Sequence, residues 1–356
     1  MNFTKILAKW YEKNKRDLPW RRTKDPYRIW VSEIILQQTR IEQGWDYYLR
    51  FIEKFPVLLA LASAEEEEVL KLWQGLGYYS RARNMHAAAK EIVNLHHGIF
   101  PKTYEEIRKL KGIGDYTAAA ISSIAFGIPS PVVDGNVLRL FSRFFGIREP
   151  VDTPKGKITV LEKAKELISP EHPGDFNQAL MDLGATICKA KNPDCSRCPV
   201  ASHCKARLHD LQNVLPITRK APAIPHRKAA AAVIRNSKGM LLVVQRPASG
   251  LLASLWKLPG GFIKVDEDTE NSLRRSVKEE LGISIRPGKH LASVNHIYTH
   301  FRITLQAYEC RLLKGTPKPL GCPNWRWASL TDLKKLPLSK IDRMIVSQAE
   351  NECNEV

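Results

Sequence analysis

Apolar residues recur at helical spacing through the first two hundred positions of the chain. Spacings of three and four residues, separated by glycine and proline, predict helices rather than strands. The predicted helices cover residues 29–38, 45–55, 65–72, 81–96, 117–126 and 136–145. Strand-like alternation is scarce before residue 207, so we expect a helical region there. Its first twenty residues are typical of an amphipathic helix and not of a signal peptide.

The pattern changes after residue 207. Residues 208–228 contain three prolines and few strong helix formers, which predicts a linker. Beyond it, strands are predicted at 229–236, 239–247 and 301–313, and a helix at 269–281. Residues 229–348 are therefore expected to form an α+β domain.

The chain is strongly basic, with 55 Lys and Arg against 37 Asp and Glu and a net charge of +18. Such an excess favours a polyanionic partner, with nucleic acid first, although a generally basic solvated surface gives the same count. No apolar run approaches the roughly 18 residues of a membrane span. We therefore expect a cytoplasmic protein without a membrane partner.

Four of the seven cysteines lie close together, with the spacing C-x6-C-x2-C-x5-C. They are Cys188, Cys195, Cys198 and Cys204. Four thiolates so spaced can surround one metal centre, either an iron–sulfur cluster or structural zinc. Zinc ribbons usually carry two C-x2-C pairs, and this sequence has one. The odd total and the lack of a secretion signal argue against a disulfide framework.

The stretch LKGIGDYT, residues 110–117, places two glycines before a predicted helix. Gly112 and Gly114 permit a tight turn, and the helix that follows presents N–H groups and a positive dipole end. Such a hairpin, over about residues 110–126, can hold a DNA phosphate without reading sequence. Many ordinary helix–helix turns share the pattern, so it is weak evidence by itself.

Two carboxylates are candidates for acid–base chemistry. Glu33 lies in the otherwise apolar stretch WVSEIILQQT, where burial raises the pKa of a carboxyl and suits it to a general acid. Its alternative role is a glutamate bonded at the helix edge. Asp134 directly precedes a predicted helix, where its plainest role is an N-cap and its other role is to hold negative charge beside a cationic sugar.

Taken in order, these motifs resemble the endonuclease III superfamily of DNA glycosylases. The stretches WVSEIILQQTRIEQ, LWQGLGYYSRARN and VDGNV narrow the resemblance to the adenine DNA glycosylase (MutY-type) family, over about residues 5–207. The resemblance implies a helix–hairpin–helix six-helix barrel with a [4Fe–4S] cluster in residues 188–204. It also implies base excision repair by a monomer associated with the bacterial nucleoid. Its substrate would be double-stranded DNA with adenine mispaired to 8-oxoguanine or guanine.

The resemblance implies a role for each matching residue. Glu33 would protonate adenine at N7, Asp134 would stabilise the oxocarbenium-like sugar, and Asn136 would help to position it. Tyr116 stands where bifunctional relatives carry a Schiff-base lysine, so lyase activity should be absent or weak. Contacts to the flipped adenine, the opposite base or phosphates are expected from Trp20, Arg21, Gln38, Thr39, Leu76, Tyr78 and Arg81. Trp20 and Leu76 would equally suit a hydrophobic core.

Residues 261–283 resemble the Nudix box, GX5EX7REUXEEXGU. Nudix hydrolases hold Mg²⁺ on the helix face that positions 276 and 280 share, and Ser276 replaces the first Glu of REUXEE. Loss of that carboxylate predicts no hydrolysis. In adenine glycosylases a degenerate domain of this kind senses 8-oxoguanine, commonly through a Phe-Ser-His loop. Tyr298, Thr299 and His300 stand at the equivalent place here.

Three other functions stay open on the sequence. A thymine mismatch glycosylase of the same superfamily can also carry tyrosine at the hairpin, and the sensor-like second domain argues against it. A true Nudix pyrophosphatase is disfavoured by Ser276. A non-catalytic helix–hairpin–helix DNA-binding protein would not need Glu33 in an apolar helix.

Overall fold

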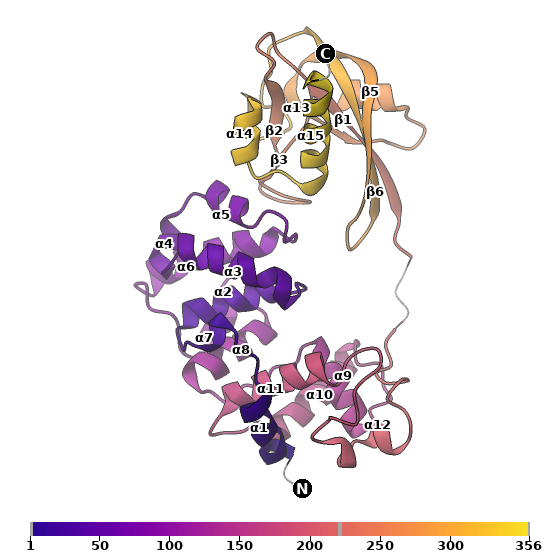
Figure 1. Ribbon diagram of the computed structural model, residues 1–356. Coiled ribbons are helices and arrows are strands. Elements are labelled where there is room, and N and C mark those ends of the chain that lie inside the picture. The colour runs from indigo at the N-terminus through magenta and orange to yellow at the C-terminus, as the bar shows by residue number, and fades with distance from the viewer. Residues whose placement is uncertain (1–2, 220–222, 355–356) are drawn as a thin grey trace. The chain divides into compact units, whose positions relative to one another are not determined.

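The computed structural model describes residues 3–219 and 223–354 (Figure 1). The chain divides into two compact units. The first comprises Met1–Ser63 and Asn84–Ala221, and the second comprises Ala64–Arg83 and Pro222–Val356.

The first unit is built from helices, and residues 3–219 contain no strand. Its helices are α1 (Phe3–Asn14), α2 (Pro26–Leu36), α3 (Ile41–Lys54), α4 (Leu58–Ser63), α7 (Tyr104–Lys109), α8 (Asp115–Phe126), α9 (Gly135–Phe145), α10 (Pro154–Leu167), α11 (Pro173–Thr186) and α12 (Lys205–Leu208). Short 3-10 turns lie at Pro19–Arg21 and Ala201–His203. Helix α6 (Ser80–Leu95) begins in the second unit's segment and continues into the first. The predicted helical region is confirmed.

Helices α2 and α8 pack against each other because both are apolar along most of their length. A run of three small residues, Ala118–Ala120, is fully buried in α8 and permits close approach. A separate cluster joins α1, α9, α10 and α11, with the rings of Phe3, Phe141 and Phe144 at its centre. These two packings fix the helices that carry the polar residues described below.

Within residues 223–354, the second unit contains two β-sheets, with strand orders β4-β1-β6-β5 and β3-β2-β7. The strands are β1 (His226–Ile234), β2 (Leu241–Gln245), β3 (Trp256–Lys257), β4 (Gly260–Phe262), β5 (Ser284–Ile297), β6 (Arg302–Lys314) and β7 (Trp325–Ala328). The helices are α5 (Glu66–Leu72), α13 (Thr269–Leu281), α14 (Leu330–Lys335) and α15 (Lys340–Asn354). Strand β1 runs parallel to β6 and antiparallel to β4. The predicted α+β character is confirmed.

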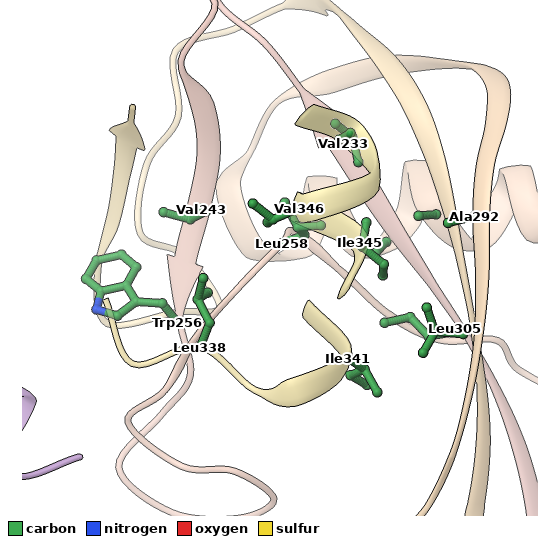
Figure 2. Packing of buried hydrophobic residues seen from close by; sticks show 14 of the residues in the cluster. Val233, Val243, Trp256, Leu258, Ala292, Leu305, Leu338, Ile341, Ile345 and Val346 are labelled. Atoms are coloured by element: carbon green, nitrogen blue, oxygen red, sulfur yellow. The ribbon is translucent and has the colours of Figure 1, made fainter. Parts of the chain in front are cut away.

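Alternate residues of β1 enter two different cores. Ala231 and Val233 join a cluster with Leu305 of β6 and Ile345 of α15, part of which Figure 2 shows. The intervening residues of β1 join a second cluster with Leu273, Val277 and Leu281 of α13. The period of two therefore places α13 and α15 on opposite faces of the sheet.

Helix α13 has the bounds that the sequence predicts. Strand β5 and helix α15 have no counterpart among the predicted elements. Part of the segment expected to be a linker packs on the first unit, because Leu215 is buried and Val151 N donates to Ile217 O. Strand β1 begins at His226, within the same segment.

Candidate active site and cofactor site

Glu33 lies on α2 among buried residues, and only 8% of its surface is exposed. Its carboxylate accepts a hydrogen bond from the Tyr116 hydroxyl, with 2.8 Å between Oη and Oε2. Tyr116 is the second residue of α8, directly after the glycine hairpin. The packing of α2 on α8 thus joins two residues that are 83 positions apart in the sequence.

Burial raises the pKa of Glu33 to about 7, because a desolvated carboxylate is disfavoured. The nearby Asp134 carboxylate also raises this pKa, whereas the hydrogen bond from Tyr116 and the charge of Arg21 lower it. A carboxyl with such a pKa can give up a proton near neutral pH. The sequence prediction of a raised pKa at Glu33 agrees with this arrangement.

Glu33, Tyr116, Asp134 and Asn136 line one cavity of about 450 Å³ in the first unit. Asp134 caps the N-terminus of α9, where its Oδ1 accepts the backbone N–H groups of Asn136 and Val137 at 2.9 and 2.8 Å. Its Oδ2 accepts the Asn136 side-chain amide at 2.7 Å. The cap role is therefore present, and the same carboxylate also faces the cavity.

Arg139 connects this carboxylate to the cysteine loop, and the sequence reasoning did not single it out. Its Nη2 donates to Asn136 Oδ1 at 2.9 Å, and its Nε donates to Cys188 O at 2.7 Å. Arg139 lies three residues after Asn136, one turn further along α9. The helical spacing could have placed it beside Asn136, but its contact with residue 188 depends on the tertiary fold.

Arg21 and Trp20 are held by the protein itself. The Arg21 guanidinium forms two hydrogen bonds to the buried Asp182, at 2.6 and 2.9 Å. Trp20 is 6% exposed and packs edge-on against Trp45 and Tyr48. Both residues still line the cavity, so they shape it while they are anchored elsewhere.

Gln38 and Thr39 both lie in the turn between α2 and α3, but they differ in exposure. Thr39 is half-buried and lines the cavity of Glu33. Gln38 is exposed and has a positive φ of 57°, an uncommon backbone conformation for a residue other than glycine.

The glycine hairpin has the geometry that the sequence predicts. Gly112 has a φ of +79°, and a Cβ there would lie 2.5 Å from the side chain of Asn84. Gly114 caps α8, and nothing would meet a Cβ at this position within 4 Å. Both glycines are exposed, so the turn presents its backbone to solvent at a helix N-terminus.

Cys188, Cys195, Cys198 and Cys204 line one pocket, and all four are free of disulfide bonds. The Arg143 guanidinium lies 3.3 Å from the Cys188 sulfur. Burial raises the pKa of Cys195, Cys198 and Cys204, and that of Cys198 reaches about 11. Thiolates in such a place need a bound cation to form, so the donor set fits an iron–sulfur cluster.

In the second unit, Leu76 and Tyr78 line a cavity of about 480 Å³ together with Tyr298, Thr299 and His300. The hydroxyls of Tyr78 and Thr299 are hydrogen-bonded. Thr299 and His300 are exposed, whereas Tyr298 packs on Phe301.

Leu76 is 9% exposed and Tyr78 is 42% exposed. Arg81 lies over the rings of Trp73 and Tyr78, and burial lowers its pKa to about 10. The second unit thus gathers the expected contacts of the opposite base, except Thr39, around one cavity.

Within residues 3–219 and 223–354, no helix is both long enough and apolar enough to cross a membrane.

Three family models match the chain. The HhH-GPD superfamily of base excision DNA repair proteins covers residues 31–170. The iron–sulfur binding domain of endonuclease III covers residues 188–204, which confirms the predicted [4Fe–4S] cluster and disfavours zinc. The NUDIX domain covers residues 230–348.

Solved structures support the fold of the helical region. A thermostable thymine-DNA glycosylase matches with a TM-score of 0.54 and 29% identity, over 58% of this chain and 95% of that chain. A trapped endonuclease III–DNA covalent intermediate matches with a TM-score of 0.51 and 23% identity, over 58% of this chain and 95% of that chain. The second match concerns the fold alone.

Curated relatives match over nearly the whole chain. The adenine DNA glycosylase of Rattus norvegicus is 36% identical over 95% of this chain and 76% of its own length. That of Homo sapiens is 35% identical over 99% of this chain and 75% of its own length. Since the similarity spans the helical region, the cysteine loop and the NUDIX domain together, the chain belongs to the adenine DNA glycosylase family of base excision repair hydrolases.

Proposed function

We propose that this DNA glycosylase removes adenine that is mispaired with 8-oxoguanine or guanine in double-stranded DNA, with little or no lyase activity. We further propose that it acts as a monomer on nucleoid DNA in the cytoplasm. The observation that carries the chemistry is Glu33, a buried carboxyl with a pKa of about 7 in a cavity shared with Asp134.

Glu33 serves as the general acid. Its proton goes to N7 of adenine, which turns the base into a better leaving group as the glycosidic bond breaks. The sugar then carries positive charge, and the Asp134 carboxylate stabilises it across the cavity. Three N–H donors hold Asp134 in place, and the side chain of Asn136 supplies one of them.

Water then completes the hydrolysis. Tyr116 has a hydroxyl where an amine would be needed to form an imine with the opened sugar. Its hydrogen bond to Glu33 instead orients the acid. Lyase activity at Tyr116 is therefore not expected.

Adenine must leave the base stack to reach this cavity. Gln38 and Leu76 fill the gap that it leaves, and Thr39 and Tyr78 face the orphaned guanine. Gly112 and Gly114 hold a phosphate through the backbone of the hairpin. Trp20, Arg21 and Arg81 border the base and its phosphates.

The second unit identifies the oxidised guanine. 8-Oxoguanine differs from guanine by a carbonyl at C8 and a hydrogen on N7. The Thr299 hydroxyl and the His300 ring can each donate or accept a hydrogen bond at this edge. Tyr298 anchors the loop through its ring contact with Phe301.

Duplexes with a single A:8-oxoguanine, A:G or T:G pair test this function. Alkali-revealed breaks should appear at adenine in the first two duplexes and not at thymine in the third. Without alkali, few or no strand breaks should appear. In the presence of borohydride, no covalent adduct should accumulate. Breaks at T:G alone would instead support a thymine glycosylase, the activity named for one similar structure.

Substitution of the proposed sensor separates recognition from chemistry. Thr299→Ala with His300→Ala should slow action on A:8-oxoguanine by about five- to a hundredfold, the loss for one desolvated hydrogen bond. Action on A:G should hardly change. Thr331→Ala, at an exposed threonine of α14, is the control. An equal, salt-dependent loss on both duplexes would show that the loop contacts phosphate instead.

A further inference from the structure

The Nudix-like box has three glutamates at its motif positions, one just before helix α13 and two on it, and each has a protein partner. Glu267 accepts two hydrogen bonds from Arg275, at 2.6 and 2.8 Å. Glu279 is 60% exposed and pairs with the same guanidinium at 3.1 Å. Only Glu280 turns toward the sheet, four residues after Ser276 on the same helix face.

Lys257, in the short strand β3, reaches this face from the opposite side. Its Nζ lies 2.6 Å from Glu280 Oε1 and 2.5 Å from the Gly260 carbonyl oxygen. The Lys257 residue is 8% exposed. The ammonium is thus enclosed, and two oxygens of different chemical type contact it.

The backbone holds these two oxygens rigidly. Gly260 has a φ of +139° and pairs with β1 so closely that a Cβ would lie 2.2 Å from Ala230 O. Its N–H donates to Glu280 Oε2 at 3.0 Å, so both carboxylate oxygens are engaged. Ser276 lies against the next residue, with its Oγ 2.9 Å from the position of a Cβ on Gly261.

A carboxylate and a backbone carbonyl are the oxygen ligands that Mg²⁺ prefers. The Nudix fold implies such an ion, yet the residues present do not fit one. One carboxylate of the face is replaced by Ser276, and the space between the other two oxygens contains the lysine ammonium.

We propose that the Lys257 ammonium is a built-in cation, which occupies the place where the Nudix-like face would otherwise hold a divalent metal ion. The ammonium neutralises Glu280 and tethers α13 to the β3–β4 segment. The second unit is therefore metal-independent at this face, and metal-assisted hydrolysis of a nucleotide is closed to it. This inference does not depend on the glycosylase function proposed above.

An ordinary buried ion pair would share part of this geometry, so the test must separate a cation site from an ion pair. Burial lowers the pKa of Lys257, and the Glu280 charge counteracts that change. Removing the lysine leaves Glu280 without its partner. If the site is a true cation site, a divalent ion should then take the vacated position.

Binding of Mn²⁺ to the full chain gives a direct measurement, with the free ion followed by electron paramagnetic resonance. The variants are Lys257→Met, Ser276→Glu and both together, with Lys278→Met as the control at an exposed lysine of α13. The parent, Ser276→Glu and the control should take up no Mn²⁺ at this face. The double variant should bind about one ion per chain, since it restores a second carboxylate.

Calorimetry gives a second readout. Lys257→Met should lower the Tm of the second unit, and millimolar Mn²⁺ should raise it again by several degrees, with no such rise in the control. The proposal is overturned if Ser276→Glu binds Mn²⁺ as well as the double variant does. It is also overturned if a double variant that still unfolds cooperatively in calorimetry binds none, or if Mn²⁺ leaves the Tm of Lys257→Met unchanged.

If Lys257→Met does not fold, Lys257→Met with Glu280→Gln removes both charges and should recover folding. Failure of that pair to recover would show that charge neutralisation is not the role of Lys257, and would overturn the proposal as well.

Discussion

Each unit has one largely buried glutamate on a helix, and the two glutamates have different kinds of partner. Glu33 on α2 has a tyrosine hydroxyl as its hydrogen-bond donor, and Arg21, whose charge also acts on Glu33, is bonded to Asp182. Glu280 on α13 has the ammonium of Lys257 and a backbone N–H. Glu33 is thus left able to carry a proton, whereas Glu280 is paired with an ammonium.

The difference shows that burial alone does not make an acid catalyst. Burial raises the pKa of a carboxyl toward neutral pH, but a cation in contact with the carboxyl lowers that pKa again. In the first unit, Arg16 and Arg21 pair with Asp182, and the charge of Arg21 lowers the pKa of Glu33 less than burial raises it. In the second unit, the Lys257 ammonium contacts Glu280 directly.

The largest expected effect comes from removing the proton of Glu33. Glu33→Gln keeps the shape of the side chain but cannot donate to N7 of adenine. The single-turnover rate on A:8-oxoguanine should fall by about 10²–10⁴-fold, the usual contribution of a general acid, while DNA binding persists. Quenched-flow cleavage and a gel-shift titration measure the two quantities.

Glu12→Gln, at an exposed residue of α1, is the matched control and should behave as the parent. A near-normal rate in Glu33→Gln would remove Glu33 from the mechanism. It would also remove the contrast between the two glutamates.

A second variant gives Glu33 the kind of partner that Glu280 has. Met181 Sδ lies 3.4 Å from the Tyr116 hydroxyl, so Met181→Lys should bring an ammonium close to the acid. A cation at that range lowers a carboxyl pKa by about 1–3 units. At pH 7.5 the protonated fraction of Glu33, and with it the cleavage rate, should fall by roughly 8- to 800-fold.

The rate of Met181→Lys should recover as the pH is lowered, because acid restores the proton on Glu33. Met181→Leu is the control for shape. If Met181→Lys is equally slow at pH 5.5, the loss is steric, and the electrostatic argument fails for this site. A borohydride adduct in this variant would show that the new amine reaches the sugar.

A third expectation concerns stability. The folded-state pKa of Glu33, about 7, lies above its ordinary value of 4.5. The folded state therefore binds this proton more tightly, and its contribution to stability is fully present below pH 4.5 and is lost as the pH rises through 7. At pH 8 the parent should be less stable than Glu33→Gln, by about 1–3 kcal/mol.

Urea unfolding of both proteins at pH 5 and pH 8 measures this difference, which should shrink at pH 5. An equal difference at both pH values would mean that the substitution changes packing and not protonation. Glu280→Gln should show the reverse sign, because it leaves the buried Lys257 without its partner.

Local patterns in the sequence predict much of this arrangement. Asp134 before α9, the glycines before α8 and the bounds of α13 follow from capping, turn chemistry and helical period. Strand β5 was not predicted, because register shifts around Pro287 and His290 break its alternation. Helix α15 was not predicted either, although it is a regular helix.

The partners that decide the chemistry are harder to predict. Lys257 and Glu280 are 23 positions apart, and Tyr116 and Glu33 are 83 apart. Neither pair shares an element, so no spacing rule joins them. The resemblance to a family places Glu33 and Asp134 in one site, but it implies no role for Lys257, which matches no position of the Nudix box.

The smallest expected effect concerns the Tyr116 hydroxyl, which is the partner of Glu33 as the Lys257 ammonium is the partner of Glu280. The Tyr116 hydrogen bond lowers the pKa of Glu33, so Tyr116→Phe should raise that pKa above 7, by about half to one unit. The alkaline limb of the single-turnover rate should move to higher pH by the same amount, and the rate at pH 6, where Glu33 is protonated in both proteins, should change little.

Tyr104→Phe, which removes a hydroxyl bonded to the surface residue Asp115, is the control and should leave the limb in place. A limb that moves to lower pH would show that the hydroxyl keeps the proton on Glu33. A uniform loss at every pH would instead mean that Tyr116 orients the acid without setting its pKa.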